Sequence, residues 1–309
     1  MKLFKPKFWG TKTNFYTIIL LPISWIFLIV IYINKKIKFS KKFKIPVICV
    51  GNIYLGGTGK TPLSIYIHDA LKDKQKKSAI IKKYYKNHRD EHELIYQKTK
   101  SLILNKKRGK ALEEAETEGY TIAILDDGFQ DHSIKKDLNI LCFHERQLIG
   151  NGFIFPAGPL RESMNSIKDV QIVLINGNKD EFFEKKLLSI NKDIKIYYSK
   201  YQPLNTEKFK NKKFLAIAGI GNPDNFFRTL INNDLNVKET MAFPDHYEFS
   251  EIELKKIIDK AKKKGLELIT TEKDFFRIKK YKLDDINYLQ VGLEIQQREN
   301  FLKQIFNYL

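Results

Sequence analysis

The chain has 309 residues, of which 43% are hydrophobic and 13% aromatic, with 16 glycines and 9 prolines. This composition is sufficient for one large or two ordinary folded domains, and it excludes a mainly disordered or collagen-like chain. The formal net charge of +19 indicates a polyanionic partner, which can be nucleic acid, an anionic membrane or a phosphorylated ligand. A general lysine bias of the sequence is the alternative explanation for part of this charge.

The first expected element is an apolar N-terminal helix between basic flanks. Eleven lysines precede the first acidic residue, Asp69, and all but Lys60 flank the uncharged segment Thr13–Asn34. Within it, Phe15–Ile33 is about as long as a helix that spans a bilayer core. No small-residue cleavage site follows, so a removed signal peptide is not expected. Because both flanks are basic, we expect a helix that lies in one leaflet, in preference to a span. A buried core helix is the alternative.

After Lys44, short apolar runs alternate with helical stretches, which is typical of βαβ units and a parallel sheet. The expected strands are Ile45–Val50, Ala79–Ile81, Thr121–Leu125, Leu138–Phe143, Val170–Ile175, Ile194–Ser199, Phe214–Ala218, Val237–Phe243, Leu266–Thr270 and Ile286–Val291. The expected helices are Pro62–Lys72, Ala111–Glu118, Asp224–Asn232 and Glu251–Lys264, the last with a capping box at Ser250 and Glu253. Cys49 and Cys142 lie in apolar runs, so we expect two buried, reduced thiols and no disulfide framework.

The strongest local motif is Gly51–Pro62, GNIYLGGTGKTP, between an apolar strand and a helix. Its glycines allow backbone N–H groups to turn toward a phosphate, and the helix N-terminus adds its dipole. Lys60 can reach the β- and γ-phosphates of a nucleotide, and the Thr61 hydroxyl can bind Mg²⁺. Tyr54 stands where a P-loop normally has its first glycine. The expected nucleotide-binding residues are Gly56, Gly57, Thr58, Gly59, Lys60 and Thr61.

A P-loop requires an acidic partner at the end of a neighbouring strand. The apolar run Thr121–Leu125 ends in Asp126 and Asp127, followed by glycine. One carboxylate can hold Mg²⁺, and the second can serve the metal or an adjacent cation. A simple Asp-Gly turn is the alternative. We therefore expect a metal site formed by Thr61, Asp126 and Asp127.

These motifs resemble the tetraacyldisaccharide 4'-kinase (lipid A 4'-kinase) family over nearly the whole chain. The resemblance rests on VGNIYLGGTGKTP, DDGFQ, GNGFIFPAGPLRE, AGIGNP, FPDH and TTEKD, in this order. It implies an α/β fold with a P-loop NTPase-like parallel sheet core, a smaller α/β C-terminal domain and an N-terminal membrane-associated helix. The implied boundaries are 1–40 for the anchor, 41–204 for the core and 205–309 for the C-terminal domain, whose last helix can return to the core.

The resemblance also implies the reaction. Such an enzyme transfers the γ-phosphate of MgATP to the 4'-hydroxyl of an acylated glucosamine disaccharide 1-phosphate in lipid A biosynthesis, giving lipid IV-A. It is monotopic, on the cytoplasmic face of the bacterial inner membrane. Asp90 is the matching catalytic base and His246 its supporting histidine, while Lys60, Asp126 and Asp127 complete the catalytic set. A solvated helix start is the alternative for Asp90, and a residue near a helix cap is the alternative for His246.

Three departures from the family pattern concern the loop near the nucleotide. The family's Ser-Arg-Gly-Tyr is Lys82-Lys83-Tyr84-Tyr85 here, the histidine after DDGFQ is displaced by one to His132, and Arg89 and His92 flank the aspartate. Lys83 and Lys86 can still meet phosphate as point charges. Arg161 can hold an anionic substrate group or form a structural salt bridge.

Two other functions compete with the kinase. A P-loop NTPase that binds nucleic acid explains the net charge of +19 but leaves the uncharged segment Thr13–Asn34 unexplained. A membrane-tethered nucleotide-binding scaffold explains both features without phosphate transfer. We expect the kinase, with ATP and Mg²⁺ as cofactors, a membrane leaflet and the acylated disaccharide as partners, and no nucleic acid.

Overall fold

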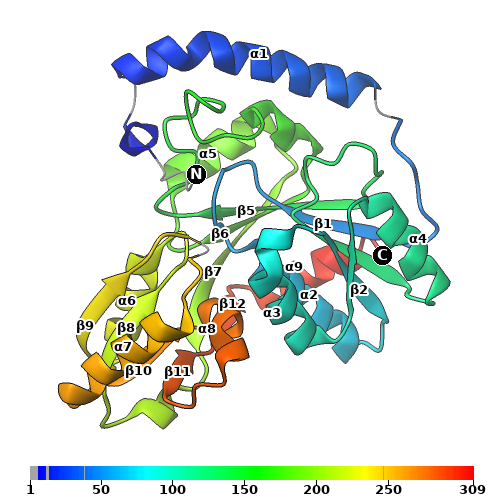
Figure 1. Cartoon of the computed structure of the whole chain (residues 1–309). Coiled ribbons are helices and arrows are strands. Elements are labelled where there is room, and N and C mark those ends of the chain that lie inside the picture. The colour runs from blue at the N-terminus through cyan, green and yellow to red at the C-terminus, as the bar shows by residue number, and fades with distance from the viewer. Residues whose placement is uncertain (1–5, 12–13, 38, 246) are drawn as a thin grey trace. The chain divides into compact units, whose positions relative to one another are not determined.

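The computed structural model describes residues 6–11, 14–37, 39–245 and 247–309 (Figure 1). These residues form two compact units. The first, here called the P-loop unit, contains the described residues up to Tyr84, together with Thr99–Lys200 and Leu293–Leu309. The second, here called the C-terminal unit, contains Tyr85–Lys98 and Tyr201–Gly292. The chain passes between the units after Tyr84 and after Lys98, and again within two strands, β7 (Lys195–Pro203) and β12 (Val291–Ile295).

An eight-stranded sheet has the order β12-β7-β6-β5-β1-β4-β2-β3. Its other strands are β1 (Val47–Gly51), β2 (Ser78–Lys83), β3 (Leu102–Asn105), β4 (Ile122–Asp126), β5 (Leu138–His144) and β6 (Ile172–Asn176). All neighbours from β7 to β3 pair in parallel. After β1, the next three strands in the chain (β2, β3 and β4) lie on one side of β1 in the sheet. Strands β5, β6 and β7 then follow on its other side. Such a reversal at β1 places a ligand crevice at the carboxyl ends of these strands.

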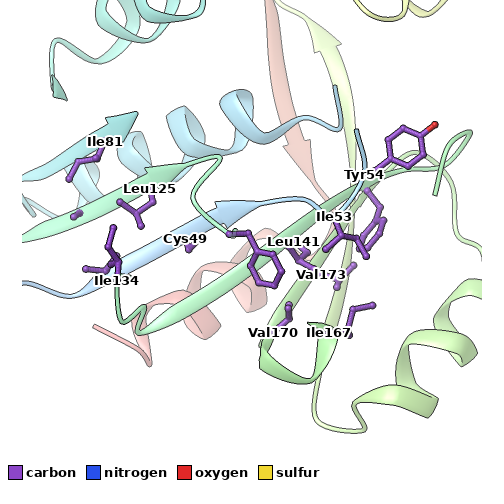
Figure 2. Packing of buried hydrophobic residues seen from close by; sticks show 14 of the residues in the cluster. Cys49, Ile53, Tyr54, Ile81, Leu125, Ile134, Leu141, Ile167, Val170 and Val173 are labelled. Atoms are coloured by element: carbon purple, nitrogen blue, oxygen red, sulfur yellow. The ribbon is translucent and has the colours of Figure 1, made fainter. Parts of the chain in front are cut away.

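Helices cover both faces of this sheet. Helices α4 (Arg108–Thr117) and α5 (Glu181–Ile190) share one apolar cluster with β1, β2, β4, β5 and β6. Figure 2 shows Cys49, Leu125 and Leu141 of this cluster on neighbouring strands. Because side chains alternate along a strand, the buried residues between them point to the opposite face, where α2 (Lys60–Asp73) contacts β1, β2 and β4.

The final helix, α9 (Arg298–Phe306), belongs to the P-loop unit. Phe301 is fully buried, and its ring lies 5.2 Å from that of Tyr197 on β7 and 6.4 Å from that of Tyr66 on α2. This aromatic group fixes the end of the chain to the unit that contains the P-loop.

The C-terminal unit has a four-stranded sheet of order β11-β10-β8-β9, with parallel pairing throughout. Its strands are β8 (Lys213–Ala218), β9 (Asn236–Ala242), β10 (Glu267–Thr271) and β11 (Ile286–Leu289). Helix α7 (Glu251–Lys263) packs on one face and α6 (Pro223–Asn232) on the other. Helices α3 (Arg89–Thr99) and α8 (Glu272–Ile278) complete the α-helices near this sheet. Short 3-10 helices span Lys7–Gly10, Lys86–His88, Met164–Asp169, Thr206–Phe209 and Lys279–Tyr281.

Helix α1 (Phe15–Ile37) buries polar side chains and exposes apolar ones, the reverse of a helix in a water-soluble core. Its buried residues are the polar Thr17 and Ser24, whereas Trp25 and Ile26 are 61% and 63% exposed. Among the described residues it is the one helix long and apolar enough to cross a membrane, and 11% of its apolar window is buried. This low burial argues against the core helix that the sequence left open as an alternative.

The predicted fold class is confirmed, and each expected strand and helix is present within a few residues. One strand was wrongly extended: Ile286–Val291 is split between β11 and β12 at Gln290. The Gln290 N–H donates to Asn205 Oδ1 at 2.9 Å, so it is diverted from the strand ladder. Ser250 accepts from the Glu253 N–H at 3.2 Å, which confirms the predicted cap. Both cysteines are buried and free, as expected.

Candidate active site

The Gly-rich segment connects the carboxyl end of β1 to the N-terminus of α2. Gly59 precedes the helix with φ 95°, and Gly56 has φ 139°, a region that side chains disfavour. The Asn52 side-chain amide donates to Gly56 O at 3.1 Å and to Thr58 Oγ1 at 2.8 Å, which holds the loop closed on itself. The loop therefore presents the N-terminus of a 14-residue helix, the usual backbone arrangement of a phosphate site.

Tyr54 is part of the core and not of the phosphate-facing surface. Its side chain is 1% exposed and belongs to the apolar cluster that contains Ile53 and Leu160 (Figure 2). Its backbone forms an antiparallel bridge with Leu160. Burial raises the pKa of the Tyr54 phenol to about 12. A buried anchor thus stands where a P-loop normally has glycine, and it joins the loop to the segment that carries Arg161.

Asp126, the last residue of β4, is fully buried and connects three elements. Its Oδ2 accepts from Thr61 Oγ1 at 2.9 Å, and its Oδ1 accepts from Ser64 Oγ at 3.2 Å. The Lys82 ammonium, from the end of the adjacent strand β2, also donates to Oδ2. The structure therefore brings together Thr61 and Asp126, two of the three predicted metal ligands.

Asp127 turns away from Asp126 because its backbone is left-handed, with φ 58°. Its carboxylate lies 3.7 Å from Lys60 Nζ and 3.0 Å from Arg161 Nη1. Burial alone would raise the pKa of this carboxyl group, but Lys60, Arg161, Lys82 and Arg108 together lower it to about 2. Asp127 is therefore ionised at neutral pH and serves the cations of the site.

Positive charge dominates this part of the P-loop unit. Lys60, Lys82, Arg108 and Arg161 lie around the carboxylates of Asp126 and Asp127, and Arg108 also pairs with Asp131 at 3.4 Å. Burial lowers the pKa of Lys60, and Asp127 partly opposes this shift. A cationic crevice beside a helix N-terminus attracts a polyphosphate. The electrostatics thus agree with the predicted nucleotide site.

The donors at Asp126 fit a magnesium ion. A hydroxyl and a carboxylate oxygen converge at 2.9 Å, and hard oxygen donors are what Mg²⁺ prefers. In the described part of the chain, no group of three or more His, Cys, Asp or Glu side chains could hold a metal. The Thr61 hydroxyl and the Asp126 carboxylate suit an ion that is bound by one or two protein oxygens and completed by substrate phosphates.

The displaced histidine still reaches a buried acid. His132 Nε2 lies 3.5 Å from Oε1 of Glu162, whose side chain is 4% exposed. Glu162 follows Arg161, which links the P-loop to the DDGFQ segment through Asn52, Asp127 and Gln130. The PAGPLRE segment therefore lies against the same crevice.

Asp90 belongs to the C-terminal unit, near the start of α3. Its side chain is 2% exposed, with Oδ2 2.5 Å from Arg277 Nη2 and 3.7 Å from Lys273 Nζ. Burial would lower the pKa of Lys273, but Glu91, Asp90 and Asp245 raise it. Asp90 is therefore a buried, paired carboxylate and not a solvated helix start. His246 lies outside the described residues.

Lys82 and Ser64 were absent from the sequence-based list of site residues. Lys82 was noted as a departure from the family pattern, but its contact with Asp126 depends on β2 lying beside β4. Ser64 follows Lys60 by one helical turn, and this spacing was the signal that could have identified it.

Comparisons with known proteins agree with this geometry. The sequence model of the tetraacyldisaccharide-1-P 4'-kinase family matches residues 16–309. The chain is 42% identical over 309 residues to the tetraacyldisaccharide 4'-kinase of Pelagibacter ubique, covering 99% of this chain and 98% of that protein. It is 33% identical over 324 residues to the enzyme of the same name from Rickettsia bellii, covering 99% of each.

A solved structure shows the same fold. LpxK from Aquifex aeolicus, crystallised in complex with ATP, superposes with a TM-score of 0.74 at 25% identity, covering 94% of this chain and 99% of that one. With the P-loop, the paired aspartates and these relatives in view, the chain belongs to the tetraacyldisaccharide-1-P 4'-kinase family of enzymes.

Proposed function

We propose that the chain transfers the γ-phosphate of MgATP to the 4'-hydroxyl of tetraacyldisaccharide 1-phosphate, giving lipid IV-A in lipid A biosynthesis. The observation that carries the proposal is the cluster of charged groups at the carboxyl ends of β1, β2 and β4, where Lys60 pairs with Asp127 and Thr61 with Asp126 at the N-terminus of α2. Phosphoryl transfer depends mainly on positioning and on neutralising charge, and this cluster supplies both.

In the P-loop unit, Gly56, Gly57, Thr58 and Gly59 bind the phosphates through their backbone N–H groups. Lys60 reaches the transferred phosphate, and Asp127 holds the Lys60 ammonium at 3.7 Å. Thr61 and Asp126 would hold Mg²⁺, while Asp127 pairs with Lys60 and Arg161. When bound, Mg²⁺ neutralises charge that develops on the phosphate oxygens. Arg161 orients Asp127 and the start of the P-loop.

We further propose that Asp90 accepts the proton of the sugar hydroxyl and that His246 supports it. A carboxylate base must be correctly oriented, and Arg277 fixes the Asp90 carboxylate through a contact of 2.5 Å between Nη2 and Oδ2. The side chain is buried, which keeps water from competing for the base. Asp90 thus has the properties of a positioned acceptor.

The site of action is the cytoplasmic leaflet of the bacterial inner membrane, with α1 lying in that leaflet as a monotopic anchor. The exposed apolar side chains of α1 and its low burial support this position. Lys36, in its last turn, suits anionic headgroups, whereas the neighbouring Lys35 pairs with Asp169 at 2.5 Å. The acylated substrate would then meet the enzyme in the plane of the membrane.

The test is a transfer assay with detergent-extracted full-length protein, labelled ATP, Mg²⁺ and the acylated disaccharide 1-phosphate. We expect label in the lipid product. Lys60→Ala and Asp90→Asn should each reduce turnover by roughly 10²–10⁴-fold, the range for loss of a charge-stabilising or acid–base group. Asp73→Asn, an exposed aspartate at the end of α2, is the matched control and should retain activity.

Three outcomes of this assay would contradict different parts of the proposal. Absence of labelled lipid with the unmodified protein would contradict the kinase. Full activity of Asp90→Asn would remove Asp90 as the base and leave the nucleotide site intact. ATP hydrolysis stimulated by DNA or RNA would support the nucleic-acid alternative, which the relatives do not favour.

A further inference from the structure

Lys82 is a buried cation inside the proposed metal site. Its side chain is 6% exposed, and its ammonium donates to Oδ2 of the fully buried Asp126. The contact follows from the sheet, because Lys82 on β2 and Asp126 on β4 are register partners. A buried ammonium is costly unless it is paired, so this lysine is committed to the carboxylate.

The same carboxylate would hold the magnesium ion of the proposed site. Asp126 Oδ2 also accepts from Thr61 Oγ1 at 2.9 Å, while Oδ1 accepts from Ser64 at 3.2 Å. Lys82 and a divalent cation therefore contend for one carboxylate. The charge of Lys82 also acts beyond this contact, since it is among the cations that lower the pKa of Asp127.

We propose that Lys82 is a positioning residue that serves as a built-in counter-cation of Asp126. It holds the carboxylate in place before the metal binds, weakens the binding of the divalent ion, and supplies positive charge that lets ATP bind with little metal. This inference rests on the proposed MgATP site and adds a determinant of its metal dependence.

If Lys82 and the divalent ion compete for Asp126, removing the charge of Lys82 should have opposite effects on metal binding and on the binding of metal-free ATP. Without the ammonium, Asp126 should bind a divalent ion more tightly, whereas metal-free ATP should lose a favourable charge and bind more weakly. We expect each change to be about tenfold, within the usual range of coupling between two ligands. A lysine with a merely structural role would weaken both kinds of binding or neither.

The test uses detergent-extracted full-length protein and the variants Lys82→Gln, Lys82→Arg and Lys76→Gln. Lys76 is exposed and precedes β2, so its replacement removes the same charge away from Asp126. Mn²⁺ binding is titrated by electron paramagnetic resonance with a non-hydrolysable ATP analogue present. Binding of the analogue in EDTA is measured by equilibrium dialysis.

We expect Lys82→Gln to tighten Mn²⁺ binding and to weaken metal-free analogue binding, each about tenfold, with Lys76→Gln unchanged. Lys82→Arg keeps the positive charge and should stay within about threefold of the unmodified protein. Unchanged or weaker Mn²⁺ binding by Lys82→Gln overturns the proposal. If that variant does not fold, tenfold tighter Mn²⁺ binding by Lys82→Arg overturns it as well.

The outcome for the unmodified protein separates the two proposals. If it binds no ATP analogue with or without Mn²⁺, the proposed nucleotide site is wrong and the role of Lys82 falls with it. If it binds the analogue and only the Lys82→Gln effect is missing, the kinase site stands and the role of Lys82 alone is wrong.

Discussion

Arg161 shows how one side chain joins two catalytic segments. Its Nη1 donates to both carboxylate oxygens of Asp127, at 3.0 and 3.3 Å, and to Gln130 Oε1 at 3.2 Å. Its Nη2 donates to Asn52 Oδ1. A planar guanidinium can serve these acceptors at once, whereas an ammonium on a flexible stem cannot hold them in one geometry. The ion pair that the sequence left open is therefore present, and it orients the groups nearest to Lys60.

Replacing Arg161 by lysine keeps the positive charge but removes the planar guanidinium, so it tests whether the geometry of the hydrogen bonds matters. We expect Arg161→Lys to lower kcat by roughly 10–100-fold, because loss of the fork lets Asp127 and the P-loop move independently. Steady-state transfer kinetics measure the effect. The control is Arg228→Lys on α6, an exposed arginine that donates to the Asp224 carbonyl. Equal kcat values for the two variants would show that charge alone suffices at position 161.

His68 makes stability depend on pH. It is 5% exposed on α2, and its Nδ1 lies 2.9 Å from Ser78 Oγ. Burial lowers its pKa from 6.5, and Lys72 adds to this shift while Asp69 opposes it. The folded protein therefore binds a proton less readily than the unfolded chain. Its full stability holds above pH 6.5 and declines as the pH falls toward the lower, folded pKa.

We expect the free energy of unfolding to fall between pH 7.5 and 5.5, by up to about 1.4 kcal/mol per pH unit from His68, and the melting temperature to fall with it. His68→Gln should flatten this part of the profile, because the buried imidazole is then absent. Thermal denaturation followed by circular dichroism at several pH values gives the comparison. An identical profile for His68→Gln and the unmodified protein would assign the acid sensitivity to other groups.

At the scale of elements, ion pairs join α3 to α8 within the C-terminal unit. Asp90 pairs with Arg277, Glu91 with Lys273 at 3.0 Å, and Lys98 with Glu272 at 2.7 Å. Arg277 also donates to the carbonyls of Gly219 and Tyr247. Helix α3 is therefore attached through charged groups more than through an apolar stripe.

Removing Arg277 should release this attachment. Arg277→Met leaves Asp90 buried without its guanidinium partner, and breaking a buried pair from one side costs about 3–5 kcal/mol. Urea denaturation measures the loss. Arg228→Met, on the surface of α6, is the control and should cost less than about 1 kcal/mol. A loss of similar size in both variants would mean that Asp90 finds another partner.

The α3 helix also explains where prediction from sequence failed. Its buried positions include Asp90, His92 and Thr99, so it lacks the apolar periodicity by which a helix is predicted. Strands such as Leu138–His144 were predictable because buried parallel strands are continuously apolar. The P-loop was predictable for a local reason, since strand, glycines and helix follow one another in the chain. The contact of Lys82 with Asp126 was not, because strand neighbours are a property of the sheet.

For the whole molecule, net charge and α1 act together. The chain carries +19, and α1 combines Lys35 and Lys36 in its last turn with apolar side chains such as Ile26, which is 63% exposed. Charge alone would give binding that salt abolishes, whereas buried apolar area would resist salt. Because α1 has exposed apolar side chains and lysines in its last turn, we expect both an electrostatic and an apolar contribution to membrane binding.

We therefore expect the protein to bind vesicles that contain anionic phospholipid, with binding reduced but not abolished in 0.5 M salt. Ile26→Glu should weaken binding at least tenfold at either salt concentration, because inserting an isoleucine contributes about 1.5–3 kcal/mol and a carboxylate opposes insertion. The matched control is Ile252→Glu on α7 of the C-terminal unit, where the isoleucine is 70% exposed. Flotation on a sucrose gradient measures the bound fraction. Equal binding of the two variants would show that α1 does not enter the bilayer, and binding lost entirely in salt would leave charge as the sole attraction.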